Sequence, residues 1–392
     1  MKKIIGLVAI AAMVATTAFA DIAIDSWGRG LWYAAANANV NGDNEIVTGM
    51  GQSWGGMAPR TAIRAHGSSD NVGFNLDVFG NGDSISQGDN ANVWVKPIQQ
   101  IQLKLGKMDD NVSRGDAVWG LWNWARFGAV NSMAGEGFIF DDGDVTGAQI
   151  IAKPVEGLTF IVGLPLSLTS GSYEQLTTTL GHKAKYIAMY TIKDIGTVKA
   201  GVLCQDKAYD KDLKKVDYEI INAAFDLTAV KNLKVSLGAF IPTATVYNVT
   251  GTSKVVVPQI NAYAEYAFNA LTIHAAVGTK INQMDKKDGI DAGDKVIEKS
   301  GFGMAFGAGA DYAFENSIGA FVDVRYANSI YQNATSADDS DNMTLGAGVT
   351  KGFSNGVFGV AFEGSTNGGG HYTLAKPDDF SWAIPVKVEY WF

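Results

Sequence analysis

The last twelve residues, Ser381 to Phe392, constrain the fold of this chain more than any other segment. They read SWAIPVKVEYWF, and from Trp382 onward every second residue is apolar. Two of the positions between are the charged residues Lys387 and Glu389. A hydrophobic period of two is typical of a β-strand with one apolar face and one hydrated face. The sequence therefore predicts that the chain ends in an amphipathic strand.

This predicted strand also ends on three consecutive aromatic residues, Tyr390 to Phe392. Exposed aromatic rings at a terminus bring little stability to a soluble domain, whereas they are stabilised at the interface of a membrane barrel. A final amphipathic strand that ends in Tyr-x-Phe resembles the assembly signal of outer-membrane β-barrel proteins, above all porins. The resemblance implies this role for Val388, Tyr390 and Phe392. The last strand of a soluble β-sandwich is the alternative that the segment alone leaves open.

The first twenty residues have the pattern of a secretory signal peptide. Lys2 and Lys3 precede an apolar run from Ile4 to Ala15, and an Ala-x-Ala end stands before Asp21. The apolar run is too short to span a bilayer as a helix. No cysteine follows the predicted cleavage point, which argues against a lipid anchor. We therefore expect residues 1–20 to be a signal peptide, and the mature protein to pass through the periplasm to the outer membrane.

Residues 21–392 show no linker that would divide them into domains. Glycine is abundant, with 46 residues, proline is scarce, with 8, and turn signals recur at short intervals. No later segment reaches the roughly 18 continuous apolar residues that a membrane helix needs. These features predict one all-β domain. For an exported protein, the closed barrel is the all-β form that spans a membrane, because it leaves no strand edge unpaired.

Counting the alternating segments predicts an antiparallel transmembrane barrel of about 18 strands, with 16 as the alternative because the first few strands show the weakest pattern. We expect 37–58 to be a glycine-rich loop, and Pro258 and Pro385 to lie near the outer rim, where a bulge or strand end tolerates proline. The long connections then lie on the external side, and both termini lie on the periplasmic side with the short turns. These turns are predicted at Ser68, Pro97, Pro154, Asp194, Val230, Asn269, Glu315 and Ser354.

Charged residues on the hydrated face of each strand are predicted to line the lumen. In one strand, Thr61, Ile63 and Ala65 alternate with Arg60 and Arg64. A charge in lipid costs about 2–4 kcal/mol at the bilayer midplane, whereas in a water-filled lumen it costs little. For any single residue, a position on the hydrated wall is a simpler interpretation than a contact that binds a solute. The candidates are Arg60, Arg64, His66, Lys104, Lys183, Lys185, Asp311, Asp323 and Arg325, with Asp77 and Glu389 among further acids on the same face.

The longest predicted connection, 108–144, is the third on the external side and contains Trp119, Trp122 and Trp124. General porins, which this chain resembles, fold their third external loop into the lumen. The resemblance here is one of order and length. It implies that three acids near the end of the loop face Arg60 and Arg64 across a constriction. The three acids are Asp141, Asp142 and Asp144. The alternative is a loop that packs on the rim or takes part in a subunit contact.

Charge and chemistry exclude several functions. The formal charge of −9 becomes −9 − 2 = −11 without Lys2 and Lys3, which argues against nucleic acid as a partner. The single cysteine, Cys204, excludes an internal disulfide, and by its parity with Val202 we expect it to face lipid. The histidines show no metal-ligand spacing, and no nucleophile–base set is evident. The four histidines are His66, His182, His274 and His371. We therefore expect no enzyme activity, no cofactor and no metal.

A porin is the function that the sequence favours: passive diffusion of small hydrophilic solutes and ions, set by pore width and wall charges. The partners implied by the resemblance are outer-membrane lipid, the barrel-assembly machinery and such solutes, with homotrimer or monomer left open. A surface adhesin or structural barrel with a plugged lumen and loop-borne function is the alternative from another class.

Overall fold

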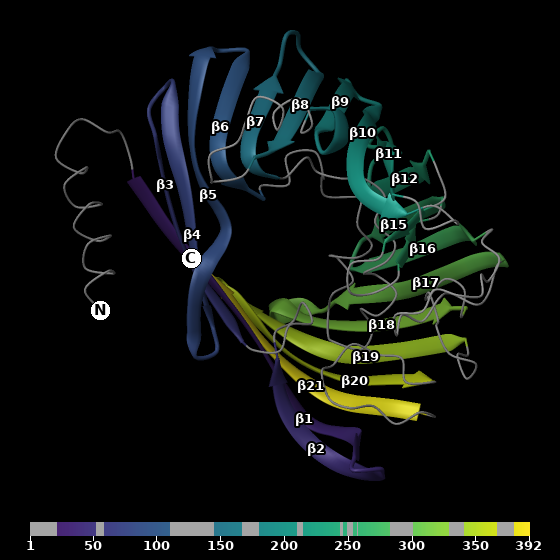
Figure 1. Ribbon diagram of the computed structural model, residues 1–392. Helices are drawn as coiled ribbons and strands as arrows, with labels where there is room; N and C mark the ends of the chain where they lie inside the picture. Colours follow the sequence, from purple (N-terminus) through teal and green to yellow (C-terminus); the bar gives the residue numbers. More distant parts are fainter. Residues whose placement is uncertain are drawn as a thin grey trace.

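The computed structural model describes residues 22–51, 59–109, 145–166, 180–209, 215–243, 246–248, 254–256, 258–282, 301–328, 341–366 and 380–392. These residues form one antiparallel sheet of 21 strands. Three of the strands, β2, β13 and β14, lie outside the main ring, so that 21 − 3 = 18 strands form the barrel. The first and last strands pair with each other and close it (Figure 1). An all-β barrel of 18 strands is thus confirmed.

The ring follows the chain order. Its strands are β1 (Ile22–Val40), β3 (Arg60–Ser68), β4 (Val72–Asn81), β5 (Ser84–Ile98), β6 (Ile101–Met108), β7 (Val145–Ala152), β8 (Leu158–Pro165), β9 (Lys185–Ile192), β10 (Gly196–Tyr209), β11 (Lys215–Leu227), β12 (Leu233–Pro242), β15 (Gln259–Phe268), β16 (Leu271–Asn282), β17 (Gly301–Ala313), β18 (Ile318–Ala327), β19 (Asn342–Phe353), β20 (Gly356–Thr366) and β21 (Phe380–Trp391). The others are β2 (Asp43–Gly51), β13 (Val246–Asn248) and β14 (Lys254–Val256).

Short turns join the strands on one side of the barrel, and each lies within two residues of its predicted position. Several of them contain an Asn or Asp with positive φ, namely Asp194 (61°), Asn232 (65°), Asn269 (53°) and Asn316 (60°). Asn and Asp tolerate this left-handed conformation better than other non-glycine residues. The turn residues therefore fix the hairpin lengths locally. No helix in the described part of the chain is long and apolar enough to cross a membrane.

The prediction of a loop over 37–58 was wrong for most of its described part. Strand β1 continues to Val40, and β2 pairs with its second half, from Leu31 opposite Gly51 to Val40 opposite Asp43. Asn41 and Gly42 form the two-residue turn, with φ values of 55° and 97°. Asn-Gly is the preferred sequence for such hairpins and could have predicted this one. Because β3 pairs with the first half of the same edge of β1, the β1–β2 hairpin projects beyond the ring (Figure 1).

Pro258 and Pro385 occupy different positions relative to their strands. Pro258 immediately precedes β15, at a strand end as expected. Pro385 instead lies in the middle of β21, opposite Tyr33 of β1, so its predicted position near the rim was wrong. The register of β1 shifts between Tyr33 and Ala35 at this point. Ala34 of β1 is the residue left out of the pairing, and proline within a sheet is found next to such bulges.

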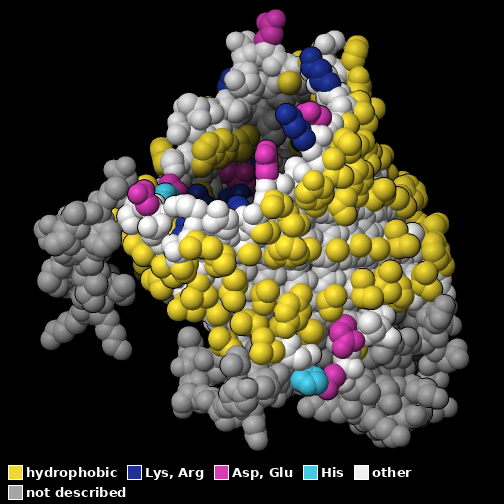
Figure 2. Space-filling view, turned by 90° about the horizontal axis from the view of Figure 1, so that it is seen from above, with side chains coloured by type: hydrophobic (Ala, Val, Ile, Leu, Met, Phe, Trp, Pro, Cys, Tyr) yellow, Lys and Arg dark blue, Asp and Glu magenta, His cyan; other side chains and the backbone are white. Residues whose placement is uncertain are grey.

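The distribution of polarity is the reverse of that in a soluble domain. Large apolar side chains are exposed on the outside, for example Ile24 (71% exposed) and Ile63 (58%), whereas Asp323 and Arg325 have no exposed surface. Figure 2 shows hydrophobic side chains covering the outer wall in a broad band, with charged side chains gathered around a hollow. The strands thus alternate between an apolar outer face and a polar inner face, as membrane barrels do.

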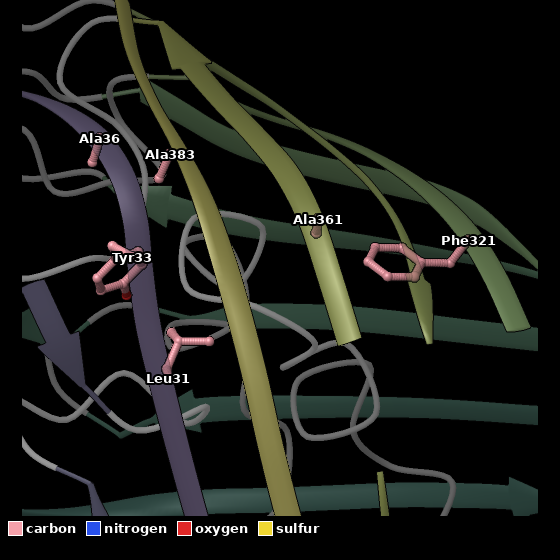
Figure 3. Packing of buried hydrophobic residues seen from close by; sticks show 6 residues of the cluster. All are labelled: Leu31, Tyr33, Ala36, Phe321, Ala361 and Ala383. Atoms are coloured by element: carbon pink, nitrogen blue, oxygen red, sulfur yellow. The ribbon is translucent and has the colours of Figure 1, made fainter. Parts of the chain in front are cut away.

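One part of the inner wall is apolar. Leu31, Tyr33 and Ala36 of β1 form a buried cluster with Phe321 of β18, Ala361 of β20 and Ala383 of β21 (Figure 3). These strands lie in the ring between β3–β5 on one side and β15–β17 on the other. The apolar cluster therefore lies on the strands that join two charged regions of the inner wall.

Candidate functional site on the inner wall

The first charged region lies on β1, β3, β4 and β21. Asp25 of β1 stands opposite Arg64 of β3, which in turn stands opposite Asp77 of β4. Arg29, on the same face of β1, stands opposite Glu389 of β21. Residues directly opposite each other in adjacent strands point to the same side of the sheet. Basic and acidic side chains from strands far apart in the sequence therefore share one patch of the inner wall.

Two arginines of this patch are stacked on aromatic rings. The Cζ atom of Arg29 lies 5.1 Å from the ring centroid of Trp27, and that of Arg60 lies 4.9 Å from the ring of Phe79. The two rings contact each other edge to face, with centroids 5.5 Å apart. Arg60 Nε also donates to Asn81 Oδ1 at 2.7 Å. A cation–π contact of this kind stabilises the position of each guanidinium group. We refer to Arg29, Trp27, Phe79 and Arg60 as the arginine–aromatic ledge.

Arg64 lies beside this ledge and is more open to solvent. Its Nε is 2.5 Å from Asp25 Oδ1, and the Arg64 side chain is 46% exposed. His66 Nδ1 lies 3.9 Å from the other carboxylate oxygen of Asp25. An ion pair this exposed contributes only about 0.2–1 kcal/mol to stability. Arg64 can therefore interact with a solute at little cost to the fold.

Three carboxylates form a second ledge, composed of Asp77, Asp89 and Asp109. Asp77 Oδ2 accepts hydrogen bonds from the backbone N and the Nδ2 of Asn90, at 2.9 and 3.1 Å. Asp89 interacts electrostatically with both other aspartates, with Lys107 and with Arg60. We refer to the three aspartates as the carboxylate ledge.

An irregularity in β5 positions this ledge. Leu76 pairs with Ala91 and Val78 with Gln87, so that residues 88–90 together stand opposite Asp77. Gly88 permits the close approach, because a Cβ atom there would be 2.5 Å from the Cβ of Asp77. Lys107 Nζ donates to the Gly88 carbonyl at 2.5 Å. Bulges next to binding sites commonly redirect a side chain in this way.

The two ledges border one cavity of about 560 Å³. Its size lies within the range of small-molecule sites, roughly 300–1,000 Å³. The charged side chains that line it are Arg29, Arg64, Asp77, Asp89, Asp109 and Glu389.

The second charged region, on β16 to β18, is centred on His274. Its Nδ1 lies 3.3 Å from Asp311 Oδ2, and its Nε2 lies 2.7 Å from Asp323 Oδ1. Gly309 of β17 stands between His274 and Asp323 in the register. A Cβ atom at Gly309 would overlap both Asp323 Oδ1 and His274 Nε2. The hydrogen bond from β16 to β18 therefore requires glycine at this position.

Further ion pairs lie on other strands, and one of them is partly exposed. Glu265 of β15, opposite His274, accepts a hydrogen bond from Tyr263 Oη at 2.7 Å and lies 3.0 Å from Lys234 Nζ. On a separate pair of strands, Lys199 and Asp226 are 2.7 Å apart. Arg325, Asp323 and Glu363 have no exposed surface. Charges removed from solvent in this way are stable only when neighbouring groups compensate them.

The predicted lining residues divide between exposed and buried positions. Lys104 is 6% exposed and stands opposite Gln149, while Lys183, just before β9, and Lys185, its first residue, are half-buried. Arg64 and His66 are open to solvent, and the Asp311 side chain is 38% exposed. Pore lining by these residues stays a prediction. Asp141, Asp142 and Asp144 lie outside the described residues, as do the predicted signal peptide and most of the third external loop.

The predicted assembly residues lie on the outer face of β21. Val388 is 53% exposed and Phe392 is 74% exposed. The rings of Tyr390 and Phe392 are 5.4 Å apart, and a Cβ atom at Gly28 would overlap the Tyr390 ring. Phe392 N donates to the Ser26 carbonyl at 2.8 Å. The terminus is thus fixed on β1, and its role in assembly stays a prediction.

Sequence reasoning missed several residues of the first charged region. Asp25, Trp27 and Arg29 alternate with Ile24 and could have been found from strand parity. Parity could not have found Asp89, because it lies in the irregular part of β5, or Asp109, because it follows the last residue of β6. No three His, Cys, Asp or Glu side chains among the described residues are grouped so that they could hold a metal ion.

Comparison with known proteins gives a fold but no close relative. No family model matches the sequence, and no curated protein sequence matches it. Solved structures do match: the anion-selective porin from Comamonas acidovorans has a TM-score of 0.50 at 12% identity, and the match covers 95% of this chain and all of that one. This chain has the porin barrel fold.

Two Pseudomonas aeruginosa proteins support the same assignment of fold. OccK2 (OpdF), solved in complex with glucuronate, matches with a TM-score of 0.54 at 13% identity and covers 96% of this chain and 99% of its own. OpdL has a TM-score of 0.54 at 11% identity, with 95% and 99% covered. The structural matches establish the porin-like architecture. Because the sequence identities are low, the solute has to be argued from the residues of this chain.

Proposed function

We propose that this protein is an outer-membrane porin through which small hydrophilic solutes and ions diffuse passively. The observation that carries the proposal is the reversed polarity of a closed barrel, with an apolar outer wall and charged residues around an inner cavity. An apolar outer wall of this extent is stable in lipid and would cause aggregation in water. A charged interior is suited to the passage of polar solutes.

The proposal includes the route to the membrane. Residues 1–20 direct export and are removed, residues 21–392 form the single barrel domain, and the assembly machinery recognises Val388, Tyr390 and Phe392. Replacing Phe392 with Ser should lower the amount of folded protein in the outer membrane more than an equally small change in an external loop. Normal levels of folded Phe392→Ser protein would contradict the assembly role.

Conductance measurements on the purified, refolded barrel in planar bilayers test the pore itself. We expect the current to increase in steps as single channels insert. The current through each channel should be linear with voltage over a moderate range. A barrel that is folded by circular dichroism but never conducts would instead support the alternative, a plugged barrel with functional loops. The complete burial of Asp323, Arg325 and Glu363 is the observation that favours this second candidate.

A further inference from the structure

The cavity between the two ledges presents both signs of charge to the same small volume. Two guanidinium groups, of Arg29 and Arg64, and four carboxylates line it, which gives a formal sum of 2 − 4 = −2. The positive groups belong to β1 and β3, whereas the carboxylate ledge belongs to β4, β5 and the residue after β6. Asp89 and Asp109 therefore lie on strands away from the two arginines, whereas Glu389 stands next to Arg29 and Asp77 stands opposite Arg64.

We propose that this cavity binds small dipolar solutes that carry a carboxylate and a protonated amine and have about the size of an amino acid. The inference rests on the proposed function, in which the cavity belongs to the diffusion path. The carboxylate of the solute contacts Arg29 and Arg64, and its ammonium group faces the carboxylate ledge. The guanidinium fork suits the first contact, because it donates two parallel hydrogen bonds to one carboxylate.

Simple anions fit this cavity poorly. The names of two similar structures refer to anions, one an anion-selective porin and the other a complex with glucuronate. In this chain, each lining arginine has its own carboxylate neighbour: Asp25 lies 2.5 Å from Arg64, and Glu389 stands opposite Arg29. An anion that reaches either arginine therefore also meets a net negative lining.

Simple cations are attracted by the net negative lining but are complementary to only one of the two ledges. Stacking on Trp27 holds the Arg29 guanidinium in place at the cavity. Arg60, held on Phe79, interacts electrostatically with Asp89 and so offsets part of the carboxylate ledge. A solute with one positive charge meets attraction on one side and repulsion on the other. Only a solute with both charges is complementary to both ledges at once, which favours recognition through paired contacts.

Three probes with one carbon skeleton test this proposal: γ-aminobutyrate, butyrate and butylammonium. Binding to the folded, detergent-solubilised protein is measured by saturation-transfer NMR, which does not depend on conduction. We expect γ-aminobutyrate to bind about fivefold more tightly than either singly charged probe, the factor that one added exposed ion pair provides. Equal binding of all three probes, or tighter binding of butyrate, would overturn the proposal.

Two variants and a matched control assign the contacts. Arg64→Gln should weaken γ-aminobutyrate and butyrate about fivefold and leave butylammonium unweakened, whereas Asp89→Asn should weaken γ-aminobutyrate and butylammonium and leave butyrate unweakened. Glu219→Gln removes a carboxylate that lies outside the cavity, beside Thr243, and should change none of the three. If Asp89→Asn has no effect on γ-aminobutyrate, the carboxylate ledge is not part of the site.

The two proposals fail in distinguishable ways. A protein that conducts ions in planar bilayers but binds the three probes equally retains the porin function and loses the dipolar site. A protein that binds γ-aminobutyrate selectively but does not conduct retains the site and loses the porin function.

Discussion

The two charged regions of the inner wall share the same strand geometry and differ in their access to solvent. In the open region, the Arg64 side chain is 46% exposed, is paired with Asp25 and lines a cavity. In the closed region, the side chains of His274 and Asp323 are 2% and 0% exposed. Strand alternation places both sets of charges on the inner face, so alternation alone does not distinguish a solute contact from a structural contact.

Solvent access determines what each set of charges contributes. Exposed charges remain hydrated, and removing one costs little stability. Buried charges have lost their hydration, and removing one partner leaves the other uncompensated, at a cost of about 3–5 kcal/mol. We therefore expect substitutions in the closed region to change stability, and substitutions in the open region to change solute selectivity.

The largest effect is expected at Gly309. Replacement with Val places atoms where His274 Nε2 and Asp323 Oδ1 now meet, so the bridge from β16 to β18 must break. We expect a loss of at least about 3 kcal/mol in the free energy of unfolding, or no folded barrel at all. Urea titration in lipid vesicles measures this. Gly181→Val is the control, because a Cβ atom at Gly181 meets nothing within 4 Å.

The contrast between the regions is tested most directly by removing one charge from each. Asp323→Asn should lower the free energy of unfolding by about 3–5 kcal/mol, because it removes a fully buried charge that is hydrogen-bonded to His274. Arg64→Gln should lower it by less than about 1 kcal/mol. Similar losses in the two variants would show that solvent access does not separate the regions as we infer.

Ion selectivity should respond to the open region alone. Arg60→Ala combined with Arg64→Ala removes two positive charges next to the cavity, so the reversal potential under a salt gradient should shift towards cation preference. Charges within about 10 Å of the ion path dominate the field at ordinary salt. Lys234→Ala is the matched control, because the Lys234 side chain is similarly exposed, at 51%, but does not line this cavity. An unchanged reversal potential in the double variant would mean that these arginines do not lie near the conducting path.

The smallest effect concerns thiol labelling. Cys204 shares its outward parity with Val198 and Val202, which are 43% and 39% exposed, but is itself only 9% exposed. Its backbone N donates to the carbonyl of Ala184, in the segment before β9. A membrane-impermeant thiol reagent should therefore label the native protein slowly. In a Cys204→Ala background, Arg64→Cys should be labelled rapidly and Glu363→Cys slowly, and rapid labelling of Glu363→Cys would contradict the closed state of that wall.

The sequence by itself determined the strand count, the turn positions and the face to which most side chains point. These follow from local properties, since alternation has a period of two and turn residues such as Asp194 and Asn269 act on their own backbone. The Asn41-Gly42 turn carried the same kind of signal, although the segment was predicted to be a loop.

Only the tertiary structure decided which charges meet and which remain open to solvent. His274 and Asp323 are 49 residues apart in the sequence, and their contact depends on the register of three strands and on glycine at position 309. Asp89 reaches the cavity because the β4–β5 pairing shifts opposite Asp77, which strand parity cannot predict. Register and burial are set by pairing between distant segments, and for that reason the local pattern found the inner wall but not the cavity within it.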